Sequence, residues 1–115
     1  MFRLINVGGR AALEHQGAWF DLARLADDPS LAAPLVAVAR HEELHTIAER
    51  CGDATPDGAV VDAVLGPPVP APRQVFGTGL NYDDHAGESG LPRPAVPLTF
   101  TKFPTCIAGP TADIP

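Results

Sequence analysis

The chain has 115 residues, enough for one domain or for one small domain with part of another. Its net charge of −6 argues against a nucleic-acid partner, because phosphate binding needs clustered Lys and Arg, whereas the eight basic residues here are scattered. No apolar run approaches the ~18 residues of a membrane helix, and the N-terminal apolar stretch is too short for a signal peptide. The two cysteines in a chain without a secretory signal predict a cytoplasmic protein with reduced thiols.

Three short strands are expected first along the chain. The apolar run Phe2–Val7 ends at a Gly-Gly pair, and Ala11–Glu14 and Ala18–Leu22 follow it, separated by the turn sequence His15-Gln16-Gly17. Short runs joined by such turns predict a small antiparallel meander. His15, at the tip of a turn, is expected to lie in solvent.

A helix is expected after the meander. Asp27-Asp28-Pro29-Ser30 is a helix-start signal, and Cys51-Gly52 is a stop signal. Between them, from residue 31 or 34 to Arg50, the apolar positions are only loosely periodic. The sequence therefore predicts a helix that breaks near Arg40.

A proline-rich segment marks the clearest boundary. Residues 67–72 hold four prolines in six positions, which cannot support a helix or an internal strand and form a stiff spacer. This predicts a small N-terminal domain at 1–66, a linker at 67–72 and the beginning of a second domain at 73–115. In that second part, Gln74–Gly79 is expected to be a buried strand and Leu98–Phe103 another strand.

The segment between these two strands carries the most chemistry. Residues 79–88 read Gly-Leu-Asn-Tyr-Asp-Asp-His-Ala-Gly-Glu. If they form one helical turn, His85 and Glu88 share a face, because positions i and i+3 are neighbours on a helix. A carboxylate beside an imidazole fixes its tautomer and favours its protonated form, which suits a general base. Asn81 and Tyr82 either line a substrate pocket next to this helical turn or form hydrogen bonds within the turn itself. The second role is favoured, because Asn prefers turns.

In this order the residues resemble the fumarylacetoacetate hydrolase family. The family's pattern is Gly-Leu-Asn-Tyr-x-x-His-x-x-Glu, a Pro-rich loop, and a strand with Phe-x-Lys before Pro-Ser/Thr-Cys, matched here by 79–88, 91–97 and 100–106. Residues 1–72 resemble the family's small N-terminal domain only in general pattern. The resemblance implies an α+β fold, in which a small domain of short antiparallel strands and a helix precedes the first strands of a mixed β-roll catalytic domain.

The same resemblance implies an enzyme that acts on 2-keto or 1,3-diketo acids. In the family a divalent cation, magnesium or manganese, holds the substrate, and a histidine–glutamate pair on a mobile short helix activates water or moves a proton. Members hydrolyse C–C bonds in acylpyruvates and fumarylacetoacetate, decarboxylate oxaloacetate, or isomerise related keto acids. The resemblance maps the pair onto His85 and Glu88 and places Lys102 near the pocket. Family members are commonly homodimers, so a second copy of the chain is an expected partner.

The metal ligands are where the chain departs from the family. The family uses a Glu-x-Glu pair and a later aspartate, but no Glu-x-Glu occurs here, and Asp113 is the only acidic residue after Glu88. A hard cation needs several oxygen ligands. We therefore expect no metal bound by this chain alone, and no catalysis by these 115 residues alone. We expect the chain to be the front part of a longer enzyme, cut at Pro115.

A competing motif lies in the predicted helix. His41-Glu42-Glu43-Leu44-His45 matches the zinc-protease pattern His-Glu-x-x-His, whose spacing puts both imidazoles on one helix face with Glu42 as a possible base. Cys51 falls where one subclass has its third ligand. However, that subclass has glycine where Ala48 stands, and zinc proteases usually have an uncharged residue at the position of Glu43. A solvated, charge-rich helix face is the favoured interpretation.

A third interpretation assigns no catalysis to the chain. It treats these residues as a domain for folding or dimer contacts only. Separately, a Cys51–Cys106 disulfide is not expected, because cytoplasmic thiols stay reduced.

Overall fold

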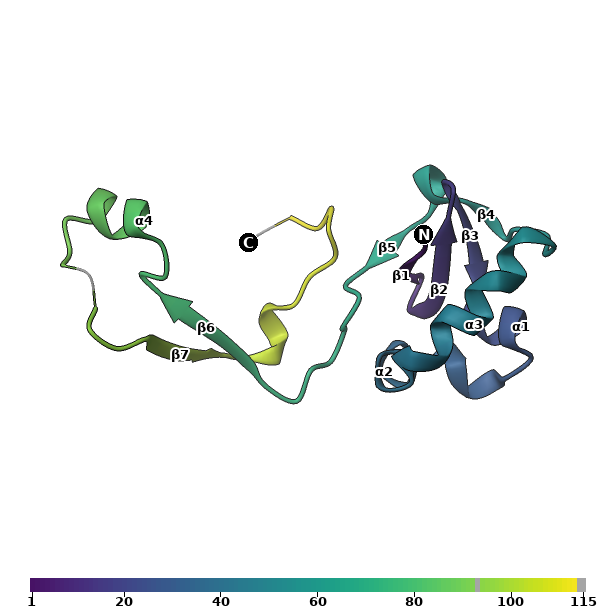
Figure 1. The fold of residues 1–115 in the computed structure, drawn as a ribbon, viewed down its shortest axis with the longest axis horizontal. Helices are drawn as coiled ribbons and strands as arrows, with labels where there is room; N and C mark the ends of the chain where they lie inside the picture. The colour runs from purple at the N-terminus through teal and green to yellow at the C-terminus, as the bar shows by residue number, and fades with distance from the viewer. Residues whose placement is uncertain (93, 114–115) are drawn as a thin grey trace. The chain divides into compact units, whose positions relative to one another are not determined.

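A computed structural model describes residues 1–92 and 94–113. Their contacts form two compact units, the first made of Met1–Ala71 with the segment from Ile107 onward, and the second of Pro72–Cys106 (Figure 1). The fold class is α+β, as the sequence predicts, with strands and short helices in the first unit and a hairpin with one helix in the second. The finer assignment of 1–66, 67–72 and 73–115 as domain, linker and second domain stays a prediction.

The first unit is built on a five-stranded sheet of order β4-β3-β2-β1-β5, in which the pairings are antiparallel. The central strands β1 (Arg3–Val7), β2 (Arg10–His15) and β3 (Ala18–Asp21) confirm the predicted meander. The turn between the first two has φ of 56° at Gly8 and 89° at Gly9, the conformation that a tight two-residue hairpin turn requires. Two-residue strands, β4 (Gly58–Ala59) and β5 (Leu65–Gly66), form the edges.

The helix predicted from residue 31 or 34 to Arg50 is present as several shorter helical segments, and its predicted break near Arg40 is confirmed. Arg40 is the C-cap residue of one short helix, and Pro34 begins that helix because Ala33 before it is extended, as a residue preceding proline prefers. An unpredicted helix also follows β3, capped by the Asp21 carboxylate, which accepts the Arg24 N–H at 3.0 Å. The helical segments are α1 (Leu22–Ala26), η1 (Pro29–Ala32), α2 (Pro34–Ala39), η2 (His41–Glu43), α3 (Leu44–Ala48), η3 (Glu49–Gly52) and η4 (Val60–Asp62).

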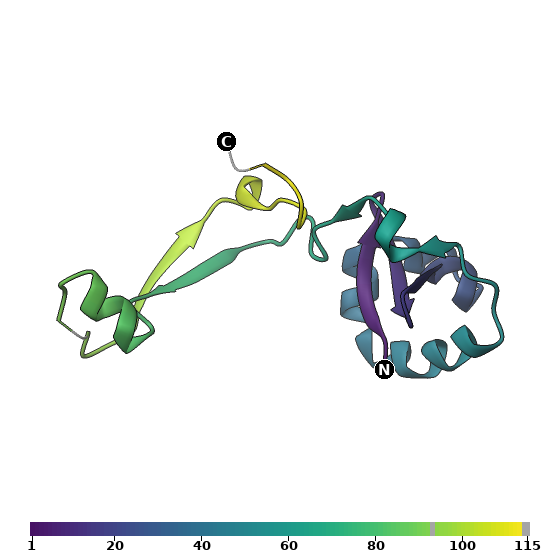
Figure 2. The same cartoon turned by 90° about the horizontal axis from the view of Figure 1, so that it is seen from above.

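The core of the first unit lies between these helices and one face of the sheet (Figure 2). Ala11 and Leu13 of β2 alternate toward the helices, as strand geometry requires, and Phe20 pairs with Leu13 on the same face. Leu13, Leu22 and Leu31 are fully buried. The cluster consists of Ala11, Leu13, Phe20, Leu22, Leu25, Leu31, Ala37, Leu44, Ile47 and Cys51.

Three parts of the first unit meet around strand β5. They are strand β1, the start of the proline-rich segment and the segment around residue 109. Beside β5 the buried Asn6 donates from Nδ2 to the Pro67 carbonyl at 2.8 Å, and its Oδ1 accepts the Gly9 N–H at 2.9 Å. A Cβ at Gly66 would lie 2.8 Å from Asn6 Nδ2, and one at Gly109 would lie 2.7 Å from the Leu65 carbonyl oxygen. Both glycines are therefore needed for close approach, and the segment around residue 109 packs on the same strand from which the proline-rich segment departs.

The second unit is a two-stranded hairpin with one short helix. Strand β6 (Val75–Gly79) pairs antiparallel with β7 (Leu98–Lys102), helix α4 (Asp83–Glu88) lies in the connection between them, and η5 (Pro104–Cys106) follows. Both strands are as predicted, but the prediction that the first is buried is wrong. Its residues alternate between half-buried and exposed, because two strands without a second packed layer cannot bury a face. No helix in the described ranges is long and apolar enough to cross a membrane.

Candidate functional site

Helix α4 starts and ends with well-defined backbone geometry. Leu80, just after β6, has φ of 50°, in the left-handed region that residues with a side chain rarely adopt, and Tyr82 is extended at the N-cap. Asp83 and Asp84 occupy the first turn, where negative charge interacts favourably with the helix dipole. At the other end, Gly90 has φ of 64° and the Leu91 N–H donates to the Ala86 carbonyl at 3.1 Å. The sequence thus fixes a helix of six residues between two turns.

His85 and Glu88 lie on this helix, three residues apart, so they share a face. Both are exposed, whereas Ala86 between them is buried and anchors the helix. Neither side chain has a hydrogen-bond or ion-pair partner in the part of the chain that the structure describes. The contact of carboxylate with imidazole is therefore not made here, and both groups are free to meet a ligand.

A pocket of about 210 Å³ opens beside the start of α4. Asn81 lines it, whereas Tyr82 does not and is 75% exposed. Its other lining residues are Thr78, Gly79, Leu80, Asp83 and Pro94–Pro97. Thr78 and the two prolines were not predicted to line a pocket, and their one sequence signal is that they flank the motif on both sides.

Lys102 lies at the other end of the hairpin from α4. The register pairs Gly79 with Leu98 next to the helix and Val75 with Lys102 four residues farther along. At about 3.4 Å per residue, the ladder separates the two ends by roughly 14 Å. The structure therefore brings His85 and Glu88 onto one helix face but does not bring Lys102 beside them, and a role for Lys102 stays a prediction.

The zinc motif does not form a metal site. The described residues contain no group of three or more His, Cys, Asp or Glu side chains that could hold a metal ion. His41 lies in η2 and His45 in α3, the two helical segments that follow the break near Arg40. Cys51 is buried in the core, and this burial raises the pKa of its thiol, which disfavours the thiolate that a metal needs. We do not propose zinc chemistry.

The chain is similar in sequence to provisionally named hydrolases and in fold to a solved bacterial protein, although no protein-family model matches it. It is 34% identical over 110 residues to a provisionally named hydrolase of Burkholderia ambifaria, which covers 90% of this chain and 35% of that protein. A provisionally named hydrolase of Burkholderia cenocepacia is 50% identical over 42 residues, covering 35% of this chain and 15% of the relative. The crystal structure of a provisionally named HpcE protein from Mycobacterium smegmatis matches with a TM-score of 0.74 and 36% identity, over 100% of this chain and 41% of that chain.

These matches extend over only part of each longer protein. The chain spans 35% of the length of the Burkholderia ambifaria relative and 41% of the solved Mycobacterium smegmatis chain. The chain therefore matches a part of each longer protein, in sequence for the first and in fold for the second.

Proposed function

We propose that this chain contributes the general base of a hydrolase or lyase of the fumarylacetoacetate hydrolase family, acting on 2-keto or 1,3-diketo acids in a cytoplasmic homodimer. The observation that carries the proposal is helix α4, which sets His85 and Glu88 on one face directly after β6. The ordered motif around this helix and the similarity to hydrolases support the same assignment.

The chemistry follows from the two side chains. The His85 imidazole takes a proton from water, and the resulting hydroxide adds to the substrate's carbonyl carbon. The adjacent C–C bond then breaks, which releases a carboxylic acid and the enolate of a keto acid, and the imidazolium returns its proton to the enolate carbon. Glu88 orients the imidazole and stabilises its charged form. Asn81 and Thr78, in the neighbouring pocket, supply polar groups for the substrate.

The family's metal ion is not accommodated by these residues. A magnesium or manganese ion needs several oxygen ligands, and within the described ranges no three acidic or histidine side chains converge. The proposed hydrolysis is therefore derived from side chains of this chain alone.

Substituting His85 tests the proposal. In the protein expressed from its full reading frame, we expect His85→Gln to lower kcat for acylpyruvate hydrolysis by about 10²- to 10⁴-fold, because general-base catalysis contributes about that much. KM is expected to change little, since the imidazole acts on water. The rate of hydrolysis is measured from the loss of the diketone's absorbance.

His41→Gln is the matched control, because it changes an exposed histidine of the first unit. An unchanged kcat in His85→Gln, or an equal loss in His41→Gln, would remove His85 from the mechanism.

A further inference from the structure

A pocket of about 270 Å³ lies within the first unit, beside the edge strand β5. It is larger than an apolar cavity that holds benzene, about 150 Å³, and smaller than most drug-sized sites, so its size suits a small molecule. Three segments that are distant in the sequence build it. Its walls include Leu4, Ile5 and Asn6 of β1, Leu65 of β5, and Ala108 and Pro110 of the C-terminal segment, residues 107–113. The proposed hydrolysis uses none of these side chains.

Proline creates this pocket by ending β5 after two residues. The antiparallel register pairs Asn6 with Gly66, so Ile5 would next face Pro67. Proline has no N–H to donate to a neighbouring strand, and the ladder stops there. The C-terminal segment packs on β5 from outside, where a Cβ at Gly109 would lie 2.7 Å from a carbonyl oxygen of the strand. The space between β1, the shortened strand and this segment is the pocket.

Asn6 is the polar member of a wall whose other described side chains are apolar, and only 3% of it is exposed. Its Nδ2 donates to the Pro67 carbonyl at 2.8 Å and its Oδ1 accepts the Gly9 N–H at 2.9 Å, so the amide is held in one orientation. A side-chain amide has two N–H donors, and Asn6 uses one of them among the described residues. A buried N–H without a partner is rarer and costlier than an unused lone pair, so the missing partner is an acceptor.

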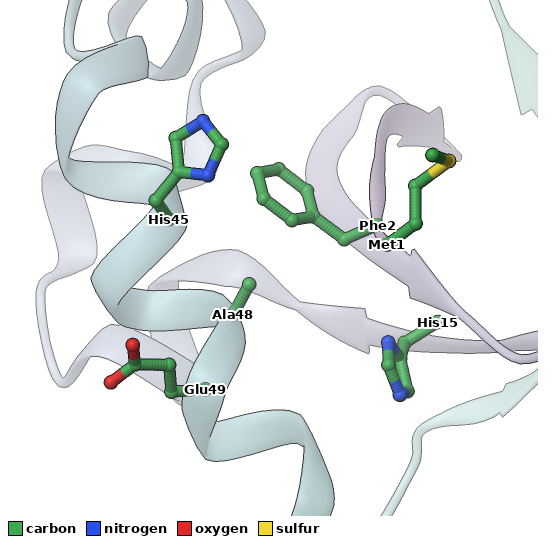
Figure 3. A pocket seen from close by; sticks show the side chains of 6 residues that line it. All are labelled: Met1, Phe2, His15, His45, Ala48 and Glu49. Atoms are coloured by element: carbon green, nitrogen blue, oxygen red, sulfur yellow. The ribbon is translucent and has the colours of Figure 1, made fainter.

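A larger pocket of the first unit, about 510 Å³, is built differently. Figure 3 shows the ring of Phe2 between the imidazoles of His15 and His45, and the ring meets His45 edge-on, with centroids 5.2 Å apart. On the rim, the Glu49 carboxylate is directed away from Phe2. The polar side chains of this larger pocket are thus spread around an aromatic ring, whereas the pocket at β5 has one oriented amide.

We infer that the pocket at β5 binds a small, neutral molecule with an apolar body and one carbonyl oxygen, which accepts the second Nδ2–H of Asn6. The body packs on Ile5 and Leu65, and burying apolar surface is favourable in proportion to its area. An ionised ligand is disfavoured, because none of the described lining residues carries a charge that could replace its hydration. The bound molecule touches β1, β5 and the C-terminal segment together, so it strengthens the attachment of that segment. The site is independent of His85 and of the proposed reaction.

Cyclohexanone titrated into the 115-residue chain tests the site. Amide NMR spectra are expected to show one saturable site with a Kd on the order of 1 mM, the affinity that so small a ligand reaches. The shifted signals are expected at Ile5, Leu65 and Ala108. Methylenecyclohexane has the same shape without the oxygen, and it is expected to bind about tenfold more weakly because the Asn6 N–H stays unpaired. Cyclohexanecarboxylate is expected to show no saturable binding at pH 7.

Two substitutions in the C-terminal segment complete the test. Ala108→Leu enlarges a side chain of the pocket wall and is expected to weaken cyclohexanone at least about tenfold, because the ligand's space is filled. Ala112→Leu makes the same change in the same segment outside the pocket, and it is expected to bind as the unsubstituted chain does. Both alanines are exposed, so neither variant is expected to unfold.

Three results would overturn the inference. The first is the absence of saturable shifts up to about 20 mM cyclohexanone, well above the expected Kd. The second is equal affinity for methylenecyclohexane, which would remove the contact with Asn6. The third is an equal loss of binding in Ala108→Leu and Ala112→Leu, which would place the ligand elsewhere. The first two are measured on the unsubstituted chain and do not depend on how a variant folds.

Discussion

The two units of this chain differ in how they hold their side chains. In the first unit Leu13, Leu22 and Leu31 are completely buried, whereas in the second Leu98 is 48% and Phe100 46% exposed. Ion pairs such as Arg3–Glu14 and Arg24–Asp57 add to the contacts of the first unit. A two-stranded hairpin alone is only marginally stable. Folding stability and the candidate chemistry are therefore located in different parts of the molecule.

This separation has a physical reason. A group that takes a proton from water must be reached by solvent and substrate, so His85 and Glu88 cannot be packed as Leu13 is. Functional segments are commonly drawn from the less stable parts of a protein for the same reason. Substitutions in one unit are therefore expected to leave the other unit largely unchanged.

The largest expected effect comes from the core of the first unit. Leu13→Ala should lower the free energy of unfolding by about 3 kcal/mol, because it removes buried methyl groups and leaves a cavity. Leu98→Ala, at a half-exposed position of the hairpin, should cost less than about 1 kcal/mol. Urea unfolding followed by circular dichroism measures both. Equal losses would mean that the hairpin shares the core's cooperativity.

A smaller effect, confined to the second unit, is expected from Gly77→Ala. A Cβ at this position would come within 2.6 Å of Phe100 Cε2, so the ring must leave its place across the strand. We expect faster amide hydrogen exchange in β6 and β7, with unfolding of the first unit changed by less than about 0.5 kcal/mol. Gly87→Ala is the control, because its Cβ would meet nothing within 4 Å. A large loss of stability in the first unit would show that the two units are coupled.

The smallest effect concerns acid stability of the first unit. Hydrogen bonds from Ser30 and the Arg40 guanidinium lower the pKa of Asp28 to about 2. Since this folded pKa is below the unfolded value, about 3.9, the contribution is present above pH ~4 and is lost as the pH falls toward 2. Asp28→Asn should therefore be less stable than the unsubstituted chain at pH 5, and the gap should close as the pH falls through 2. Urea midpoints across this range measure the difference, and a gap that does not narrow between pH 5 and pH 2 would contradict the assignment.

The features predicted well from the sequence are those with local causes. The meander follows from short apolar runs between glycine turns, and the shared face of His85 and Glu88 follows from their spacing alone. Helix α1 was missed because its five residues continue the apolar run of β3, and its signal is the capping bond of Asp21.

The features predicted poorly depend on distant partners. Whether β6 is buried depends on what packs on it, which no residue of Gln74–Gly79 encodes. The distance of Lys102 from α4 depends on hairpin register, which the linear spacing of the motif does not reveal. The pocket lined by His15 and His45 joins residues 30 positions apart in the sequence, which lie near one another only once β2 and α3 have packed in the folded first unit.

The close packing of Gly66 and Gly109 at β5 has a consequence for truncation. The first unit contains residues from before and from after the second unit, because the segment that begins at Ile107 belongs to it and Gly109 packs on Leu65. Among the described residues, its core cluster includes none from 72–106. A short flexible linker from residue 71 to residue 107 would therefore leave the core contacts of the first unit in place.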